Sequence, residues 1–167
     1  SSVPILPANL IFKTAAGEDR LMTYESLSDG GFATGSMLGS GGFIVYDDTA
    51  CIVRNTWNFS RFYHHESCGQ CSPCREGTGW LEKVLHRIEN GHGREEDIEL
   101  LWTIQSKIEG NTICPLGDAA AWPVAAAIRH FKEEFEFHIR FPEKVKNREH
   151  FVAEPFEKVR HLLKQTV

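Results

Sequence analysis

The sequence has no apolar stretch long enough to cross a lipid bilayer. Its longest apolar run, from Ala119 to Ile128, falls well short of the roughly 20 residues that a transmembrane helix needs, and Pro123 interrupts it. We therefore expect no direct membrane insertion, which leaves docking on a membrane complex open.

Acidic residues outnumber basic ones, 23 to 18. The formal net charge is -5, and no stripe of lysine or arginine overrides this average. Because binding to nucleic acid depends largely on such a basic surface, the sequence predicts no nucleic-acid partner. The 41% hydrophobic and 25% charged residues are typical of a globular protein, and 167 residues suffice for one domain or two small ones.

Cysteine is too rare for a disulfide scaffold. The chain has five cysteines, an odd number, and four of them stand in two tight contexts. This pattern favours a reducing compartment in which the thiols bind a metal. We expect the fifth, Cys51, to have no partner nearby and interpret it as a small buried apolar residue; a labile redox thiol would need an exposed, electropositive setting.

Turn-forming residues dominate the first part of the chain, up to about residue 48. Gly42–Tyr46 is β-branched and aromatic between glycines and aspartates, which predicts a buried strand. Asn9–Phe12 is a second candidate strand, and Tyr24–Leu27 a single helical turn. This is an incomplete α+β unit, because two short strands cannot close a core alone.

The remainder has helical periodicity. One helix is expected near Ala50–Tyr63, and a short one near Phe156–Leu163. The other three helices present apolar residues at helical spacing: Trp80, Leu81, Val84, Leu85 and Ile88, before a stop at Asn90-Gly91; Ile98, Leu101, Trp102, Gln105 and Ile108, after Glu95-Glu96-Asp97 and before Gly110-Asn111; and Val124, Ile128, Phe131 and Phe135, after the cap residue Asp118. Together they predict a small helical bundle, in which Pro123 either kinks its helix or marks its first turn.

The strongest motif is a cysteine triplet with a remote fourth cysteine. Cys68, Cys71 and Cys74 have CxxCxxC spacing, and Cys114 precedes a proline far downstream. A short loop can reach three corners of a cubane cluster but cannot wrap around its far side, so the fourth ligand must come from elsewhere. The pattern predicts a [4Fe-4S] cluster, and with it an electron carrier.

Several neighbours would support such a cluster. Gly69 lets the backbone approach closely, and Arg75 would place a positive charge beside a negative cluster. His64 and His65 could provide a ligand or tune the potential, although partly exposed histidines more often only pack and form hydrogen bonds.

Two other uses of the cysteines stay open. Structural zinc suits four cysteines, but such sites usually present two separated pairs, and zinc would make the chain a zinc-stabilised interaction module. A CxxC redox pair is the weaker reading, because no thioredoxin-like βαβ pattern surrounds it.

Three segments carry a family resemblance. They are HESCGQCSPCREGTGW at 65–80, ICPLGDAAAWPVAAAIRHF at 113–131 and TYESLSDGGFATGSMLGSGGFIVYDD at 23–48. In matching order they resemble the flavoprotein subunit of NADH:quinone oxidoreductase, respiratory complex I, over nearly the whole chain up to about Ile139. The resemblance implies an α+β, mainly α fold: a partial ubiquitin-like β-grasp (SLBB) unit at 1–48, a helical iron-sulfur domain at 49–140, and a tail with a short helix at 141–167.

The resemblance also implies a role. In that family the four motif cysteines bind a [4Fe-4S] cluster, NADH reduces FMN, and single electrons pass through this cluster to further clusters and quinone. The part that binds NADH and FMN precedes everything in this sequence, so we expect no catalytic residues here and no unassisted NADH oxidation. Related subunits of NAD-dependent hydrogenases and formate dehydrogenases share the cysteine pattern, so the parent complex stays open.

The implied partners are other subunits of a peripheral arm: a thioredoxin-like [2Fe-2S] subunit and a large iron-sulfur subunit. The implied location is peripheral, on the cytoplasmic or mitochondrial-matrix side of an energy-transducing membrane. A third possibility is a β-grasp ligand-binding unit in which the cluster is merely structural.

Two lesser features have plain interpretations. Gly39–Gly42 lacks the lysine and hydroxyl residue of a phosphate-binding P-loop and precedes a strand, so it predicts a tight turn. The acidic groups Glu95-Glu96-Asp97 and Glu133-Glu134 are expected on solvated helix faces.

Overall fold

The computed structural model describes residues 11–13, 19–21, 44, 46 and 50–146. The chain forms two compact units, residues 1–45 and 46–167. In the first, the strands β1 (Ile11–Lys13) and β2 (Asp19–Leu21) pair antiparallel, with Phe12 opposite Arg20.

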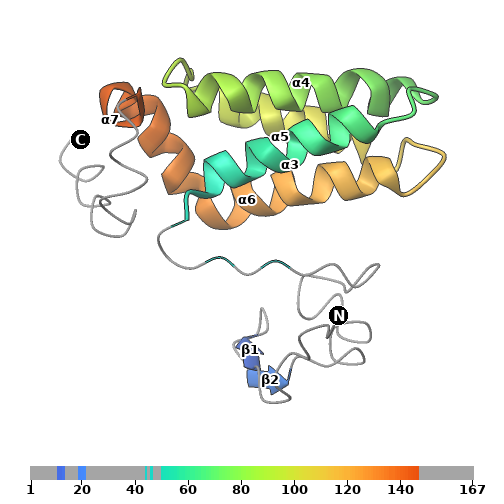
Figure 1. The fold of residues 1–167 in the computed structure, drawn as a ribbon, viewed down its shortest axis with the longest axis horizontal. Coiled ribbons are helices and arrows are strands. Elements are labelled where there is room, and N and C mark those ends of the chain that lie inside the picture. Colours follow the sequence, from blue (N-terminus) through green and yellow to red (C-terminus); the bar gives the residue numbers. More distant parts are fainter. Residues whose placement is uncertain (1–10, 14–18, 22–43, 45, 47–49, 147–167) are drawn as a thin grey trace, which may run out of the picture. The chain divides into compact units, whose positions relative to one another are not determined.

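Five helices follow in the second unit, and they form the greater part of what the structure describes (Figure 1). They are α3 (Ile52–Glu66), α4 (Ser72–Glu89), α5 (Asp97–Ile108), α6 (Leu116–Arg140) and α7 (Pro142–Lys146). None of the described helices combines the length and the apolar character that crossing a bilayer would take. The prediction of a mainly helical fold is thus confirmed over the described residues.

Helices α3 to α6 pack as a bundle. Helix α3 contacts α4 and α6, and α5 contacts the same two helices (Figure 1). The core takes one or more residues from each helix: Val53, Leu81, Leu85, Ile88, Leu101, Ile108, Ala121, Val124 and Phe135. These are mostly the residues whose helical spacing predicted the bundle, since an amphipathic helix buries its apolar stripe.

The predicted helix boundaries largely hold. Helix α4 ends at Glu89 with Asn90 as its C-cap, as expected, and α5 ends at Ile108, shortly before Gly110, whose φ of +70° suits glycine. Helix α6 begins at Leu116 rather than at Asp118. Trp80 was expected in the core, but the structure leaves it about half exposed.

Helix α6 is kinked, although not at its proline. Pro123 lies inside the helix, whereas the non-helical backbone angles occur at Phe131, with φ -130° and ψ 28°. The kink turns Phe131 out of the apolar face, so its predicted core position is wrong and its side chain is exposed. The last part of α6 therefore runs in a different direction, which is visible in Figure 1.

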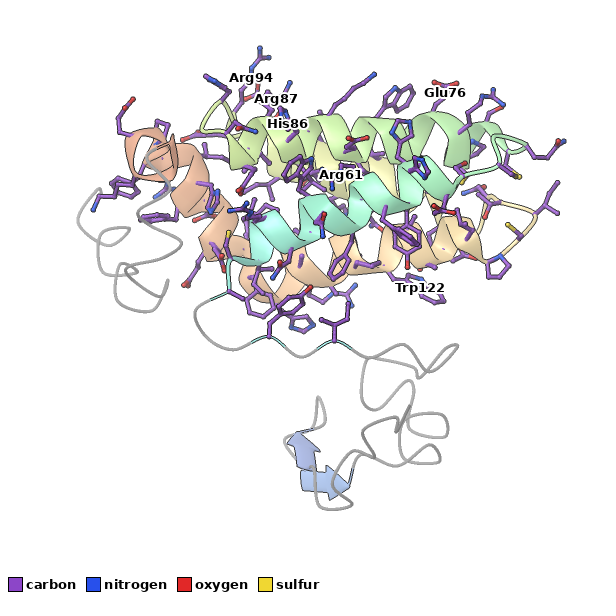
Figure 2. All side chains as sticks on the ribbon, viewed as in Figure 1. Arg61, Glu76, His86, Arg87, Arg94 and Trp122 are labelled. Atoms are coloured by element: carbon purple, nitrogen blue, oxygen red, sulfur yellow. The ribbon has the colours of Figure 1, made fainter. Side chains whose placement is uncertain are left out.

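Asp97 was expected in solvent and is instead fully buried. Its carboxylate accepts hydrogen bonds from the Arg87 guanidinium and from the Arg94 backbone amide, the latter at 2.8 Å. Figure 2 shows Arg87 and Arg94 where α4 gives way to α5. Asp97 thus fixes this turn, because its charge is paired and hydrogen-bonded.

Several expectations concern residues outside the described part. The turn at Gly39–Gly42, the helical turn at Tyr24–Leu27 and the helix near Phe156–Leu163 lie there, as does most of the strand Gly42–Tyr46. Ile44 and Tyr46 are described, exposed and outside any strand, so a buried strand is wrong at these two residues. The second predicted strand, Asn9–Phe12, is confirmed at its last two residues, within β1.

Candidate metal centre

The cysteine triplet lies in the connection between α3 and α4. Cys68 is exposed in the loop, Cys71 is the half-buried N-cap of α4, and Cys74 is buried in the first turn of α4. Pro73 stands at the start of α4, where its fixed φ suits a helix and its missing N–H is not needed. The sequence therefore sets two of the three cysteines on the rigid beginning of a helix.

Hydrogen bonds close this loop on itself. Gly69 has a φ of +78°, which glycine adopts without strain. Its carbonyl accepts a hydrogen bond of 2.7 Å from Nη1 of Arg75, one turn into α4. The Arg75 guanidinium also contacts Glu76 and Ser72. Arg75 thus holds the loop as well as bringing a positive charge to it.

Cys114 lies exposed in the connection between α5 and α6. The Thr112 hydroxyl donates to the Cys114 carbonyl at 3.0 Å, and Asp118 accepts from the Gly110 amide at 2.7 Å. A Cβ on Gly117 would stand 2.4 Å from the Thr112 hydroxyl oxygen, so only glycine fits at that position. The connection is therefore shaped by local polar contacts.

The two connections meet at one end of the bundle (Figure 1). The backbone amide of Ile113, the residue before Cys114, donates to Sγ of Cys71 at 3.4 Å. The helices that lead to them are in close contact, because a Cβ on Gly77 of α4 would lie 2.7 Å from Cγ1 of Ile108. Packing thus brings the segment of the remote cysteine against the triplet loop, as the sequence predicts.

The local electrostatics favour a negative group. Helices α4 and α6 both begin at these connections, with Cys71 and Pro115 as their N-caps. Helix N-termini carry partial positive charge and free N–H groups. Sγ of Cys74 also lies 3.1 Å from the Ser67 hydroxyl. The four cysteines thus lie on two connections that also hold two helix N-termini and a guanidinium, a chemistry that would suit a negatively charged thiolate cluster.

The histidine pair has other partners. Nδ1 of His64 lies 2.6 Å from a carboxylate oxygen of Glu82, and Nδ1 of His65 lies 3.0 Å from Glu66. The His64 ring also covers Gly79, where a Cβ would stand 3.0 Å from Nε2. Both histidines thus pack and form hydrogen bonds, in keeping with the plainer of their two interpretations.

Sequence reasoning missed a second group of ionisable side chains. Sγ of Cys51 lies 3.4 Å from Nε2 of His138, so the expectation that Cys51 has no partner is wrong. Glu134 is buried beside them, so its expected place on a solvated face is wrong too. The spacing of Glu134 and His138, four residues apart on one helix face, was the available signal. Cys51 is far from both residues along the chain, so no sequence pattern connects it with them.

Burial changes the proton affinity of this second group. It raises the pKa of the Cys51 thiol well above its ordinary value, and the nearby carboxylates of Glu134 and Glu89 raise this pKa further. Burial likewise raises the pKa of Glu134, while hydrogen bonds from the Ile52 amide and from Cys51 act in the opposite direction. Both effects follow from the loss of water around a charge.

Comparison with known proteins finds similar chains among NADH-oxidising enzymes. Residues 54–138 match the model of the NADH-ubiquinone oxidoreductase-F iron-sulfur binding region. The corresponding NADH-quinone oxidoreductase subunit of Rickettsia typhi is 46% identical over 84% of this chain and 31% of its own length. The mitochondrial NADH-ubiquinone oxidoreductase 51 kDa subunit of Neurospora crassa is 44% identical over 84% of this chain and 26% of its own length.

A solved structure agrees with these relatives. The crystal structure of the H2-reduced NAD+-reducing [NiFe]-hydrogenase matches 57% of this chain and 17% of its own chain, with 34% identity and a TM-score of 0.55. This chain spans about a third or less of the relatives it matches.

Proposed function

This chain belongs to the family of the NADH-ubiquinone oxidoreductase-F iron-sulfur binding region, and from that premise we propose that it is a one-electron relay. Its ligands are Cys68, Cys71, Cys74 and Cys114, which hold one [4Fe-4S] cluster. The observation that carries the proposal is the 3.4 Å contact from the Ile113 amide to Sγ of Cys71, because it joins the two cysteine segments.

The order of the cysteines along the chain favours a cluster over zinc. Structural zinc sites usually present two separated pairs of ligands, whereas this chain has a CxxCxxC triplet and one remote cysteine that precedes a proline. A cubane spreads its four ligands over the corners of a larger body.

Residues of this chain would hold and tune the cluster. When bound, the cluster takes up and releases one electron at a time. The Ser67 hydroxyl and the Ile113 amide stand within hydrogen-bonding distance of two ligand sulfurs. Such contacts orient thiolates and stabilise negative charge on them. The N-termini of α4 and α6 add to this stabilisation.

In the whole protein, electrons reach this region from NADH through FMN, both bound upstream, and leave through further clusters toward quinone. The unit at 1–48 is a partial β-grasp domain, 49–140 the cluster domain and 141–167 a tail. The partners are a thioredoxin-like [2Fe-2S] subunit and a large iron-sulfur subunit of a peripheral arm, on the cytoplasmic or matrix side of its membrane. Relatives named NADH-quinone oxidoreductase are 44–46% identical and the hydrogenase structure 34%, which favours complex I over a hydrogenase.

The direct test of the ligand set is Cys114→Ser. We expect the variant, purified without oxygen, to lose the four-iron content and visible absorption of the wild type, and to unfold more easily, because cluster binding and helix packing depend on each other. Cys51→Ser is the matched control for iron content and absorption, though not for stability, since it makes the same chemical change far from the loops and should keep the iron. A Cys114→Ser protein with full iron, an unchanged spectrum and unchanged stability would show that the ligand assignment is wrong.

A further inference from the structure

Three metal-binding side chains converge at the other end of helix α3. The ligand atoms of Cys51, Glu134 and His138 all lie within 4.8 Å of one another. Cys51 caps the N-terminus of α3, and the other two stand on α6 beyond its kink. The length of α3, 15 residues, puts about 22 Å between this group and the cysteine loops. The two centres are therefore separate.

Two members of the group are enclosed in the core, and Cys51 is partly buried against it. His138 is fully buried and Glu134 is 4% exposed. Val53, two residues after Cys51, and Phe135, next to Glu134, belong to the hydrophobic core. A thiol, an imidazole and a carboxyl group gathered in such a place give up their water and contact one another and backbone amides instead. Such a cluster of ligand atoms is a place where a bound cation would be stabilised.

The distances and the donor types suit zinc. Bonds of about 2.3 Å to sulfur and 2.0–2.1 Å to nitrogen place the two ligand atoms of a tetrahedral site about 3.6 Å apart. Sγ of Cys51 and Nε2 of His138 are 3.4 Å apart. Thiolate and imidazole are ligands for zinc, whereas Mg²⁺ and Ca²⁺ prefer oxygen alone. We propose that Cys51, Glu134 and His138 form a Zn²⁺ site that ties the start of α3 to the end of α6.

Each ligand has a supporting contact. Nδ1 of His138 lies 3.8 Å from a carboxylate oxygen of Glu89, which is ion-pair distance and longer than a hydrogen bond, so Glu89 brings a negative charge to the side of the ring away from Cys51. Oε1 of Glu134 accepts a 2.8 Å hydrogen bond from the Ile52 amide. Sγ of Cys51 accepts one from the Arg54 amide at 3.4 Å. The helix N-terminus also favours the thiolate. Zn²⁺ would bind the thiolate of Cys51 and the carboxylate of Glu134, and any proton held by either group would leave to solvent.

X-ray absorption at the zinc edge tests the site directly. The full chain with its iron-sulfur cluster intact is equilibrated with Zn²⁺ and freed of excess metal. We expect one zinc per chain, with one sulfur at about 2.3 Å and nitrogen or oxygen at about 2.0–2.2 Å. No retained zinc, or zinc with two or more sulfurs, would overturn the proposal; the second result would place the metal on the cysteine loops.

Variants separate the two centres. His138→Gln and Cys51→Ser are expected to weaken zinc binding more than 100-fold while iron content stays full. Glu89→Gln removes a negative charge 3.8 Å from Nδ1 of His138 and should weaken zinc binding by a smaller factor, about 10-fold. His130→Gln, at an exposed histidine of the same helix, should change nothing. If His138→Gln and wild type bind zinc with the same affinity, the zinc site is wrong. That result would not bear on the assignment of the iron-sulfur ligands.

Discussion

At the scale of single residues, the sulfurs of Cys74 and Cys71 have different hydrogen-bonding neighbours. Sγ of Cys74 lies 3.1 Å from the Ser67 hydroxyl, and Sγ of Cys71 accepts a hydrogen bond from the Ile113 amide at 3.4 Å. A side-chain donor can be removed by substitution, whereas a backbone donor cannot. Ser67 is therefore the place where the potential of the cluster can be changed without touching a ligand.

Ser67→Ala should lower the reduction potential of the cluster. Hydrogen bonds to cluster sulfurs stabilise the more negative, reduced form, so losing one favours the oxidised form. An anaerobic redox titration measures the midpoint. Ser72→Ala, with its hydroxyl 3.4 Å from the Arg75 guanidinium, serves as the control and should keep the wild-type value. A Ser67→Ala midpoint equal to or above the wild type refutes the role of this hydroxyl.

Glu134 gives the metal-free chain a pH dependence. Burial raises the pKa of its carboxyl group in the folded state above the unfolded value of about 4.3. The folded state thus holds its proton more tightly than the unfolded state, and this contribution to stability is present at low pH. It is lost as pH rises through the raised pKa.

Glu134→Gln should remove the loss of stability at higher pH. The glutamine amide oxygen can still accept the hydrogen bond from the Ile52 amide, and the amide never ionises. Urea unfolding in the presence of a zinc chelator, repeated from about pH 4 upward, measures the effect. The stability of wild type relative to Glu134→Gln should fall as pH rises. Glu133→Gln, at the exposed neighbouring position, should run parallel to wild type. If the stability of Glu134→Gln also varies with pH in parallel with wild type, Glu134 is not the group responsible for the pH dependence.

At the scale of elements, the contact of α4 with α5 positions the two cysteine connections. Gly77 permits this contact, because any Cβ there would meet the buried Ile108 side chain at 2.7 Å. Ile108 is the last residue of α5, so the chain leaves this contact directly into the segment of Cys114. The distance between the helices is thereby linked to the geometry of the centre.

Gly77→Ala should destabilise the chain by about 1–3 kcal/mol, the usual cost of overpacking, and should lower the yield of four-iron protein. Alanine normally favours a helix over glycine, so a loss here points to the contact and not to helix propensity. Thermal unfolding and iron analysis provide the measurements, with Lys107→Ala, exposed on α5, as the control. A Gly77→Ala chain at least as stable as wild type and full of iron would show that the contact does not matter.

The elements also show which features the sequence reveals. Helix α4 is predictable because its apolar spacing, Pro73 and Asn90 all indicate the same segment. Cys68, Cys71 and Cys74 are recognisable because their spacing is local. Asp97 and Glu134 were misjudged as solvated, since a charged residue's burial depends on partners elsewhere in the chain, here Arg87 and the start of α3.

At the scale of the whole molecule, the helical unit carries a centre at each end of α3. One end holds the cysteine loops and the other the group of Cys51, Glu134 and His138. The second centre escaped sequence reasoning because Cys51 meets His138 across 87 positions of the chain, and the kink at Phe131 is not signalled by Pro123. Because the two sites are far apart on one bundle, loss of iron and loss of zinc can be measured separately.

The claim that one cluster relays single electrons is tested most directly by an anaerobic redox titration of the wild-type chain, followed by electron paramagnetic resonance and Mössbauer spectroscopy. We predict four irons per chain in one tetranuclear cluster, and a paramagnetic signal that grows with one-electron dependence on potential. A chain whose loop cysteines hold zinc and no iron, or whose iron spectrum does not respond to potential, would contradict it.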